Sequence, residues 1–474
     1  MKKIYLFKIT CVMLFLSSCS NYVDIVPKGQ KIPSTVDDLA YMMTIADRDS
    51  EWDYSDVLKS ADDNLNVMTD DIYLSEESGV ANSFPDARIS LQHLYTWAKD
   101  IYEISENDLT WNNLYHSNYC VNYVLNHISE VSPGEVYDRD DVKGMALAHR
   151  AFNYFILANI YGKQYDKATA SSDLAVPLLL DADVNLKLPR ATVQEVYDQI
   201  IRDCQDALKL LKYDTHTYAH IPGRAMVHAL LSRVYLFQSD WNNAYNEAKA
   251  ALAMKSDIVD YNMIFPNVEG EPAYGLLNYN DMFGSASNTI SELFYYRPGV
   301  NVGYMSQDFS SILDRENDLR FRHFIGINAS IGAIDYGPCN QLSFAMCIMT
   351  SEVELNLAES ALRKTDKAPS EALAALESIR VKRIDAASYQ PLAENLSSEE
   401  LFKAILKERR LETRFSLMRW FDLKRLNKFP ETQKTLKRTV NGITYTLEPN
   451  SPRYVMPIPA KESAYNPNII QNER

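Results

Sequence analysis

The stretch Leu401–Phe429, LFKAILKERRLETRFSLMRWFDLKRLNKF, decides how this chain is expected to fold. A serine and acidic residues precede it at 397–400, where they would cap and complement the free amide groups of a helix start. Apolar residues then recur near helical spacing, while Glu408 and Glu412 lie one turn apart beside two arginines. The stretch therefore predicts a helix with one apolar face and one charged face.

A second cluster of aromatic residues follows, in which Trp420 and Phe421 are interleaved with charged residues of both signs at 419–425. This pattern predicts a second short helix that folds back, so that its charges meet those of the first. Mixed-sign charge on an amphipathic helix is usually solvated or paired. We therefore interpret the charges as a structural ion network, with direct participation in a binding surface as the alternative.

The N-terminus has the pattern of an export signal. Lysines precede the apolar run Ile9–Leu16, which is too short to span a bilayer but has the length of a signal-peptide core. The run ends in Leu16-Ser17-Ser18-Cys19, a lipobox pattern in which the cysteine thiol accepts a diacylglyceryl group. We expect residues 1–18 to be removed and Cys19 to carry acyl chains that anchor the protein to a membrane. The alternative is an ordinary cleavable signal. Residues 19–33 are expected to form an extended tether.

The composition is that of an acidic globular protein. The 474 residues are 46% hydrophobic, which is enough for one large core or two joined cores. The 63 acidic and 48 basic residues give a net charge of -15, which argues against nucleic acid as a partner. None of the six cysteines forms a C-x-x-C pair, so zinc ribbons and thioredoxin-like chemistry are not expected. Cys120 and Cys204 lie in apolar helical patterns and are expected to be buried.

Helical periodicity covers most of the chain after residue 33. In Gly223–Ala253 small and aromatic residues follow the order of a tetratricopeptide helix pair, in which small side chains let two helices approach closely. Residues 354–379 repeat this order less regularly. These repeats predict a packing scaffold and specify no ligand by themselves.

Residues from about 262 to 344 have a different character, with glycines among aromatic and short apolar runs. Strands are predicted at Ser291–Tyr296 and Phe321–Ile327, and Asn441-Gly442 predicts a hairpin further on. We therefore expect a mainly α fold. A tetratricopeptide-like helical scaffold covers about 34–261 and 345–474, and an irregular, loop-rich α+β insertion separates these two parts.

Patterns typical of catalysis are missing from the sequence. The eight histidines lack H-E-x-x-H spacing, and no G-x-S-x-G motif or Gly-rich phosphate loop is present. The acid pairs Asp62-Asp63 and Asp70-Asp71 are interpreted as surface background, because dense surface acids are expected in a chain this acidic. A calcium site among them is not expected, because they lack the spacing and glycine of a calcium loop. We expect a protein that is not an enzyme and has no metal or cofactor. A surface glycosidase is the enzymatic alternative, because its two carboxyl groups need no local signature.

Aromatic residues are more informative about a ligand. Tyrosine outnumbers phenylalanine by 30 to 17, and a tyrosine joins an apolar face to a hydrogen-bonding tip. Sugars combine apolar faces with hydroxyl groups in the same way, and peptides can use such a surface too. The candidate ligand contacts in expected loops are Trp52, Tyr54, Tyr73, Tyr95, Trp97, Tyr295, Tyr296, Arg297 and Tyr304. For each of them core packing or ordinary surface is the alternative, and Trp111, Trp241 and Trp420 are expected in the core.

The C-terminal stretch resembles the signature of the SusD/RagB family of outer-membrane nutrient-binding lipoproteins. The matching residues, expected to be structural, are Glu408, Arg409, Arg410, Glu412, Phe415, Arg419, Trp420, Phe421, Asp422, Leu423 and Arg425. Residues 24–35 and 456–472 resemble the N- and C-terminal parts of that family's mature chains, while the middle of the chain matches only in its general residue pattern. Ser416-Leu417-Met418 departs from the family, which usually has a glycine in the break between the two helices.

The resemblance implies a SusD-like domain over 34–474 that captures an oligomeric nutrient, a glycan, without cleaving it. It also implies a lipid-anchored protein on the outer membrane that faces the cell exterior and serves a SusC-like TonB-dependent β-barrel transporter. The family's ligand surface precedes a Trp-x-x-Leu-Tyr helix, here Trp111–Tyr115, and includes the irregular middle region. This favours Tyr95, Trp97 and the region Tyr295–Tyr304. The alternatives are a peptide-capturing lid of the RagB kind and a tetratricopeptide-like adaptor without a small ligand.

Overall fold

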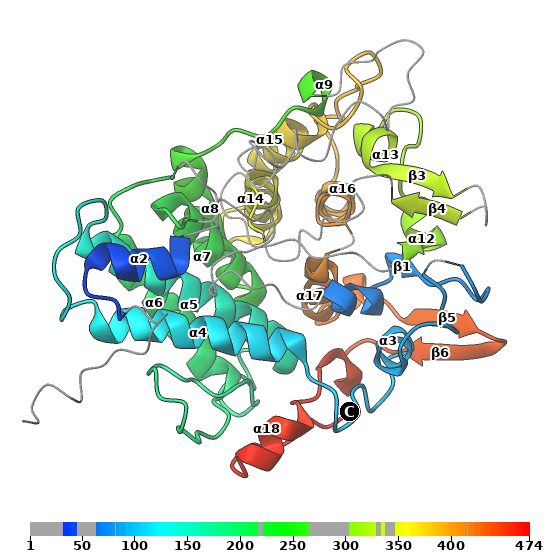
Figure 1. The fold of residues 1–474 in the computed structure, drawn as a ribbon. Coiled ribbons are helices and arrows are strands. Elements are labelled where there is room, and N and C mark those ends of the chain that lie inside the picture. Colours follow the sequence, from blue (N-terminus) through cyan, green and yellow to red (C-terminus); the bar gives the residue numbers. More distant parts are fainter. Residues whose placement is uncertain are drawn as a thin grey trace, which may run out of the picture.

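The fold is mainly α-helical, as predicted, and its strands form three two-stranded sheets among the residues described (Figure 1). The computed structural model describes residues 32–44, 63–80, 82–216, 221–264, 303–328, 333–336, 347–414 and 416–474. The predicted signal, Cys19, most of the tether, and the strand at Ser291–Tyr296 lie outside these ranges. Figure 1 shows the early helices on one side, the sheets on the other, and the later helices between them.

The first half of the chain builds a layer of packed helices. Neighbours in sequence from α4 to α8 are also neighbours in space, and α2 packs on α4 and α5. The elements are α2 (Val36–Thr44), η2 (Asp63–Met68), α3 (Ile89–Tyr95), α4 (Leu109–His127), α5 (Arg139–Tyr161), α6 (Val193–Leu210), α7 (Arg224–Gln238), α8 (Trp241–Met254) and α9 (Tyr261–Ile264). The predicted helix pair at 223–253 is confirmed, with Ala244, Ala248 and Ala251 of α8 fully buried.

The second half of the chain completes the core. Helix α14 packs on α7, α8, α15 and α16, so early and late helices share one hydrophobic interior. The elements are α12 (Gln307–Ser310), α13 (Leu319–Phe324), α14 (Thr350–Arg363), α15 (Pro369–Arg380), α16 (Ser398–Glu412), α17 (Leu417–Leu426), η4 (Pro430–Thr432), η5 (Pro452–Tyr454) and α18 (Ala460–Tyr465). Cys120 and Cys204 are both buried, as expected.

Three short antiparallel pairs form the sheets. They are β1 (Ile72–Tyr73) with β2 (Tyr304–Met305), β3 (Ile325–Asn328) with β4 (Ala333–Tyr336), and β5 (Leu436–Val440) with β6 (Ile443–Leu447). The last pair confirms the predicted hairpin, since Asn441 and Gly442 have φ angles of 50° and 77° as its turn requires. The strand predicted at Phe321–Ile327 is partly wrong. Its first residues continue helix α13, which begins where Asp318 accepts the backbone N–H of Arg320 at 2.8 Å.

The two helices of the C-terminal stretch form as predicted. Ser397 and Glu400 make a reciprocal capping box at the start of α16. The break before α17 needs no glycine, because Ser416 is extended and its side chain accepts the backbone N–H of Met418 at 3.2 Å. The Ser416 hydroxyl also donates to the carbonyl of Thr413 at 2.6 Å. A serine cap therefore replaces the glycine-mediated break.

Candidate ligand-binding site

A mostly buried set of ion pairs positions the loops of the site, and we call it the signature network. Its members are Asp70, Asp71, Asp308, Asp318, Arg320, Glu359, Arg383, Glu408, Arg409, Arg410, Glu412, Arg419, Asp422 and Arg425. They come from α12, α14, α16 and α17, from α13 and the residue before it, from the segment after α15 and from the segment before β1, and Asp308 is 51% exposed. Trp420 of the predicted signature is fully buried beside them and donates its indole N–H to the carbonyl of Tyr454 at 3.2 Å.

The charges of α17 meet those of α16, as the sequence predicts. Arg409 bonds Asp422 at 2.7 Å, and Asp422 also accepts from Arg425 at 2.6 Å. Arg320 lies between Glu408 and Glu412 at 2.6 and 2.7 Å. Burial opposes ionisation of Glu412, but the charges of Arg383 and Arg320 outweigh it and hold its pKa well below the usual range. The network is therefore structural, and it is buried instead of solvated.

The network fixes the two acids that precede β1. Arg410 bonds Asp71 at 2.8 Å, and Arg419 bonds both carboxylate oxygens of Asp70 at 2.8 Å. The interpretation of this acid pair as surface background was wrong, because Asp71 is fully buried. The sequence hides this role, since the partners lie far along the chain. As a result β1, with Tyr73, has a fixed position against the late helices.

Four predicted ligand contacts come together next to the network. Tyr73 pairs with Tyr304 across β1 and β2. Tyr95 accepts the backbone N–H of Leu74 through its hydroxyl at 3.2 Å, and Trp97 donates its indole N–H to the carbonyl of Met68 at 2.9 Å. We call Tyr73, Tyr95, Trp97 and Tyr304 the aromatic cluster. It joins three segments that are far apart in the sequence.

Arg438 of β5 packs on two residues of the cluster, Tyr95 and Trp97, and sequence reasoning missed it. Its guanidinium lies 4.0 Å from the ring centre of Tyr95 and 4.4 Å from that of Trp97, in cation–π geometry. It also donates to the carbonyls of Tyr95 and Thr69. Burial lowers the pKa of Arg438 to about 10. The available signal was the strand pattern, in which Arg438 alternates with exposed residues and so falls on the buried face.

The residues of the aromatic cluster differ in their exposure to solvent. Tyr73 is 38% exposed, whereas Tyr95, Trp97 and Tyr304 are 4%, 1% and 1% exposed. Trp97 also has a φ angle of 52°, a left-handed conformation that is costly for a bulky residue and that occurs often at functional sites. Tyr73 can therefore meet a ligand directly, while the other three support it in this structure. Their role as ligand contacts stays a prediction.

Other candidate residues are placed as follows. Trp52, Tyr54, Tyr295, Tyr296 and Arg297 lie outside the described residues. Trp111 is in the core as expected, whereas Trp241 is only half-buried and packs against the core.

Within the described ranges, no group of three or more His, Cys, Asp or Glu side chains could hold a metal ion. No helix in the described part of the chain combines the length and apolar character needed to cross a membrane.

Two protein-family models match this chain. Residues 36–236 match a SusD-like family described as starch-binding and associating with the outer membrane, and residues 345–474 match the SusD family. The chain belongs to the SusD/RagB family. The second match contains the whole C-terminal stretch, and with it the network residues of α14, α16 and α17.

Relatives of this SusD/RagB-family chain extend over most of its length. SusD-like protein P2 of Formosa agariphila is 23% identical over 390 residues, which are 70% of this chain and 73% of that protein. A SusD superfamily structure from Bacteroides thetaiotaomicron has a TM-score of 0.64 at 22% identity and covers 87% of this chain and 95% of its own. Surface glycan-binding protein A of Bacteroides uniformis has a TM-score of 0.62 at 17% identity and covers 87% and 94%. These structures share the fold.

Proposed function

We propose that this protein is a cell-surface lipoprotein that captures an oligosaccharide without cleaving it and passes it to a SusC-like TonB-dependent β-barrel transporter. Membership of the SusD/RagB family supports this proposal, because one of the matching family models is described as starch-binding and associating with the outer membrane. A structural neighbour is named as a surface glycan-binding protein. The ligand is proposed to bind at the aromatic cluster.

The observation that carries the proposal is the exposed ring of Tyr73 on a rigid base. A sugar ring stacks on an aromatic face, and stacking is strongest where the ring is held in place before the ligand arrives. Tyr73 has this support from its strand partner Tyr304, from the acids fixed by Arg410 and Arg419, and from Tyr95, which accepts the N–H of the next residue, Leu74, and packs on Arg438. Noncovalent capture needs such a surface and no catalytic group.

The rim around Tyr73 supplies polar groups that suit hydroxyl-rich ligands. Asn82 donates to the carbonyl of Gly303 at 3.4 Å, and Glu76 accepts the backbone N–H of Asn441 at 3.0 Å. Phe84 lies half-buried beside Tyr95, with ring centres 5.7 Å apart. Apolar rings with a few fixed polar groups are typical of small-molecule sites.

Calorimetric titration of the purified full chain with a panel of polysaccharides and mixed peptides tests this function. We expect saturable binding to one glycan class with no product formed. Tyr73→Ala should lower the affinity at least tenfold, because it removes the exposed apolar face. Tyr213→Ala is the matched control, since Tyr213 is 56% exposed after α6 and outside the cluster. Unchanged binding by Tyr73→Ala would refute the site, and binding to peptides alone would favour a RagB-like lid.

Anchoring and delivery are tested separately. Cys19→Ala should abolish incorporation of labelled palmitate and release the protein from membranes, whereas Cys120→Ala, at a buried thiol, should change neither. Gently solubilised outer membranes should yield the protein together with a β-barrel transporter. Purification of a membrane-bound protein that never carries a barrel partner would count against the delivery step.

A further inference from the structure

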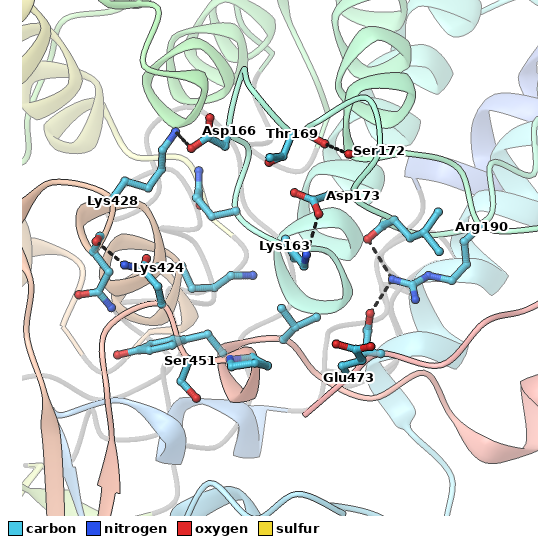
Figure 2. A pocket seen from close by; sticks show the side chains of 18 of the residues that line it. Lys163, Asp166, Thr169, Ser172, Asp173, Arg190, Lys424, Lys428, Ser451 and Glu473 are labelled. Atoms are coloured by element: carbon cyan, nitrogen blue, oxygen red, sulfur yellow. Dashed lines mark hydrogen bonds and ion pairs between the residues drawn. The ribbon is translucent and has the colours of Figure 1, made fainter.

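A cavity in the protein is lined by none of the residues of the aromatic cluster. Figure 2 shows it from close by. Its volume is about 650 Å³, within the range of ligand pockets of roughly 300–1,000 Å³. Five parts of the chain line it: the segment 163–174 after α5, Arg190 before α6, the end of α17, the loop 450–455 and the tail 470–473. Its walls therefore combine early and late parts of the fold.

Lys424 of α17 is the buried cation of this cavity. Its side chain is 4% exposed, and its ammonium donates to the carbonyls of Asn159 and Gly162, which uses two of its three N–H groups. These carbonyls belong to the C-terminal end of α5, whose dipole supplies only about half a negative charge. No carboxylate bonds Lys424 among the described residues. Its positive charge is therefore only partly compensated.

Arg190 adds a second buried positive charge. It is 6% exposed and donates to the carbonyls of Ala175 and Ile470 at 2.7 and 2.8 Å, and to the side chain of Asn472 at 2.8 Å. All its partners in the described part of the chain are neutral oxygens. Burial lowers the pKa of Arg190 to about 10 and that of Lys424 to about 7, which is the expected effect of a charge that lacks a counter-ion.

The other charges of the cavity are largely matched. Lys163 bonds Asp173 at 2.7 Å, and Lys428 lies 3.7 Å from Asp166. The remaining acid of the lining, Glu473, is exposed to solvent. Figure 2 shows these pairs around the cavity, with Lys424 on the same wall as Lys428. The excess of positive charge thus comes from the two buried cations.

Apart from the apolar and aromatic residues Leu174, Pro452, Tyr454, Val455 and Ile470, the rest of the lining consists of hydroxyl and amide side chains. They are Thr169, Ser172 and Ser451 with Gln164, Asn427, Asn450, Gln471 and Asn472. Such groups both donate and accept hydrogen bonds, which is what the hydroxyls of a saccharide require. A ligand that suits the whole cavity therefore carries hydroxyl groups and one negative charge.

We propose that this cavity binds an acidic saccharide unit, a sugar bearing a carboxylate or sulfate group, with the anionic group at Lys424 and the hydroxyls on the amide and hydroxyl walls. A buried cation without a counter-ion is unfavourable, and an anionic ligand removes that cost. The proposal rests on saccharide capture as the function and names the chemical class of one ligand. A glycan with regular acidic residues could then bind at the cavity and at the aromatic cluster together.

Calorimetry of the full chain with a digalacturonate, a sulfated disaccharide, a neutral disaccharide and inorganic sulfate tests the proposal. We expect at least one acidic sugar to bind at least tenfold more tightly than the neutral one, and the two acidic probes distinguish carboxylate from sulfate. Lys424→Met should weaken that binding at least tenfold, while Lys209→Met, at a 72% exposed side chain on α6, should not. Inorganic sulfate that binds as tightly as the acidic sugars would overturn the saccharide assignment.

A second variant covers the case in which Lys424→Met fails to fold. Lys428→Met leaves Lys424 in place and should reduce acidic-sugar binding about threefold, because it removes a positive charge from the same wall. Equal binding of acidic and neutral sugars by the wild-type chain would overturn the proposal regardless of either variant. Tyr73→Ala separates the two sites: it should weaken polysaccharide binding and leave the acidic disaccharide unaffected. Loss of both by Tyr73→Ala would refute a separate cavity site.

Discussion

The buried pair of Arg425 and Glu359 allows a quantitative test of the signature network. Arg425 bonds the two carboxylate oxygens of Glu359 at 2.7 and 2.8 Å, and both side chains are at most 3% exposed. Arg425→Met would leave the Glu359 carboxyl buried, with Arg363 at 3.3 Å as its nearest ion-pair partner. Removing one partner of a buried pair costs about 3–5 kcal/mol.

The cost should depend on pH. Burial opposes ionisation of Glu359, but Arg425 outweighs it and keeps the pKa below its usual value. Without Arg425 burial dominates, so the carboxyl takes up a proton on folding. Holding a carboxyl of ordinary pKa near 4.3 protonated costs about 1.4 kcal/mol per pH unit, hence about 4 kcal/mol at pH 7 and about 1 kcal/mol at pH 5. Arg425→Met should therefore be most destabilising at neutral pH and recover as the pH falls.

Urea unfolding of the purified chain at pH 7 and pH 5 measures this difference. The double variant Arg425→Met, Glu359→Leu should regain part of the lost stability, because the unpaired carboxylate is removed and Asp422 keeps Arg409, while Arg363 at 16% exposure loses its partner. Lys403→Met is the matched control in an exposed pair with Glu399, where the side chains are 72% and 76% exposed, and it should stay within about 0.5 kcal/mol of wild type. A loss below about 1 kcal/mol at pH 7, or an equal loss at both pH values, would refute the reasoning.

Three further predictions test other features by thermal or urea unfolding. Gly303→Ala should destabilise the protein by more than about 2 kcal/mol, because the φ angle of Gly303 is 114° and a Cβ there would lie 2.4 Å from the side chain of Ile72. Gly442→Ala is the control and should cost only about 1 kcal/mol, because Gly442 has a φ angle of 77° but open space around it. Equal losses of stability in the two variants would contradict the proposed clash. Ser416→Ala should cost about 1 kcal/mol through loss of the α17 cap, and a stabilised variant would argue against it. Since the folded pKa of Lys424 is about 7, below its unfolded value near 10.4, the unfolded chain binds more protons between these values; wild-type stability should rise with pH across this window, and Lys424→Met should remove the rise.

The helical part of the fold was predictable because its signals are local. Caps and periodicity at 397–429, small residues in α8, and the turn at Asn441-Gly442 act over a few residues. Membership of the SusD/RagB family followed from one such stretch. The predicted meeting of α16 and α17 charges also held, since the two helices are adjacent in sequence.

Features that depend on distant partners were not predictable from the sequence. Asp71 was interpreted as a surface acid, because nothing near it in the sequence indicates Arg410. Arg438 was missed for the same reason, although its strand register was a usable clue. The sequence selected Tyr73, Tyr95, Trp97 and Tyr304 as contacts but could not rank them by exposure, since burial is decided by residues from three separate segments.

The late position of the network's cations has a consequence for synthesis. A chain emerges from the ribosome with its N-terminus first. The charges of Asp70 and Asp71 can be paired only after Arg410, Arg419 and Lys434 have been synthesised. A chain cut short before these residues would have to bury acids without partners, so its core cannot close. The network thus couples folding to completion of the polypeptide, and it keeps unfinished chains open to proteolysis.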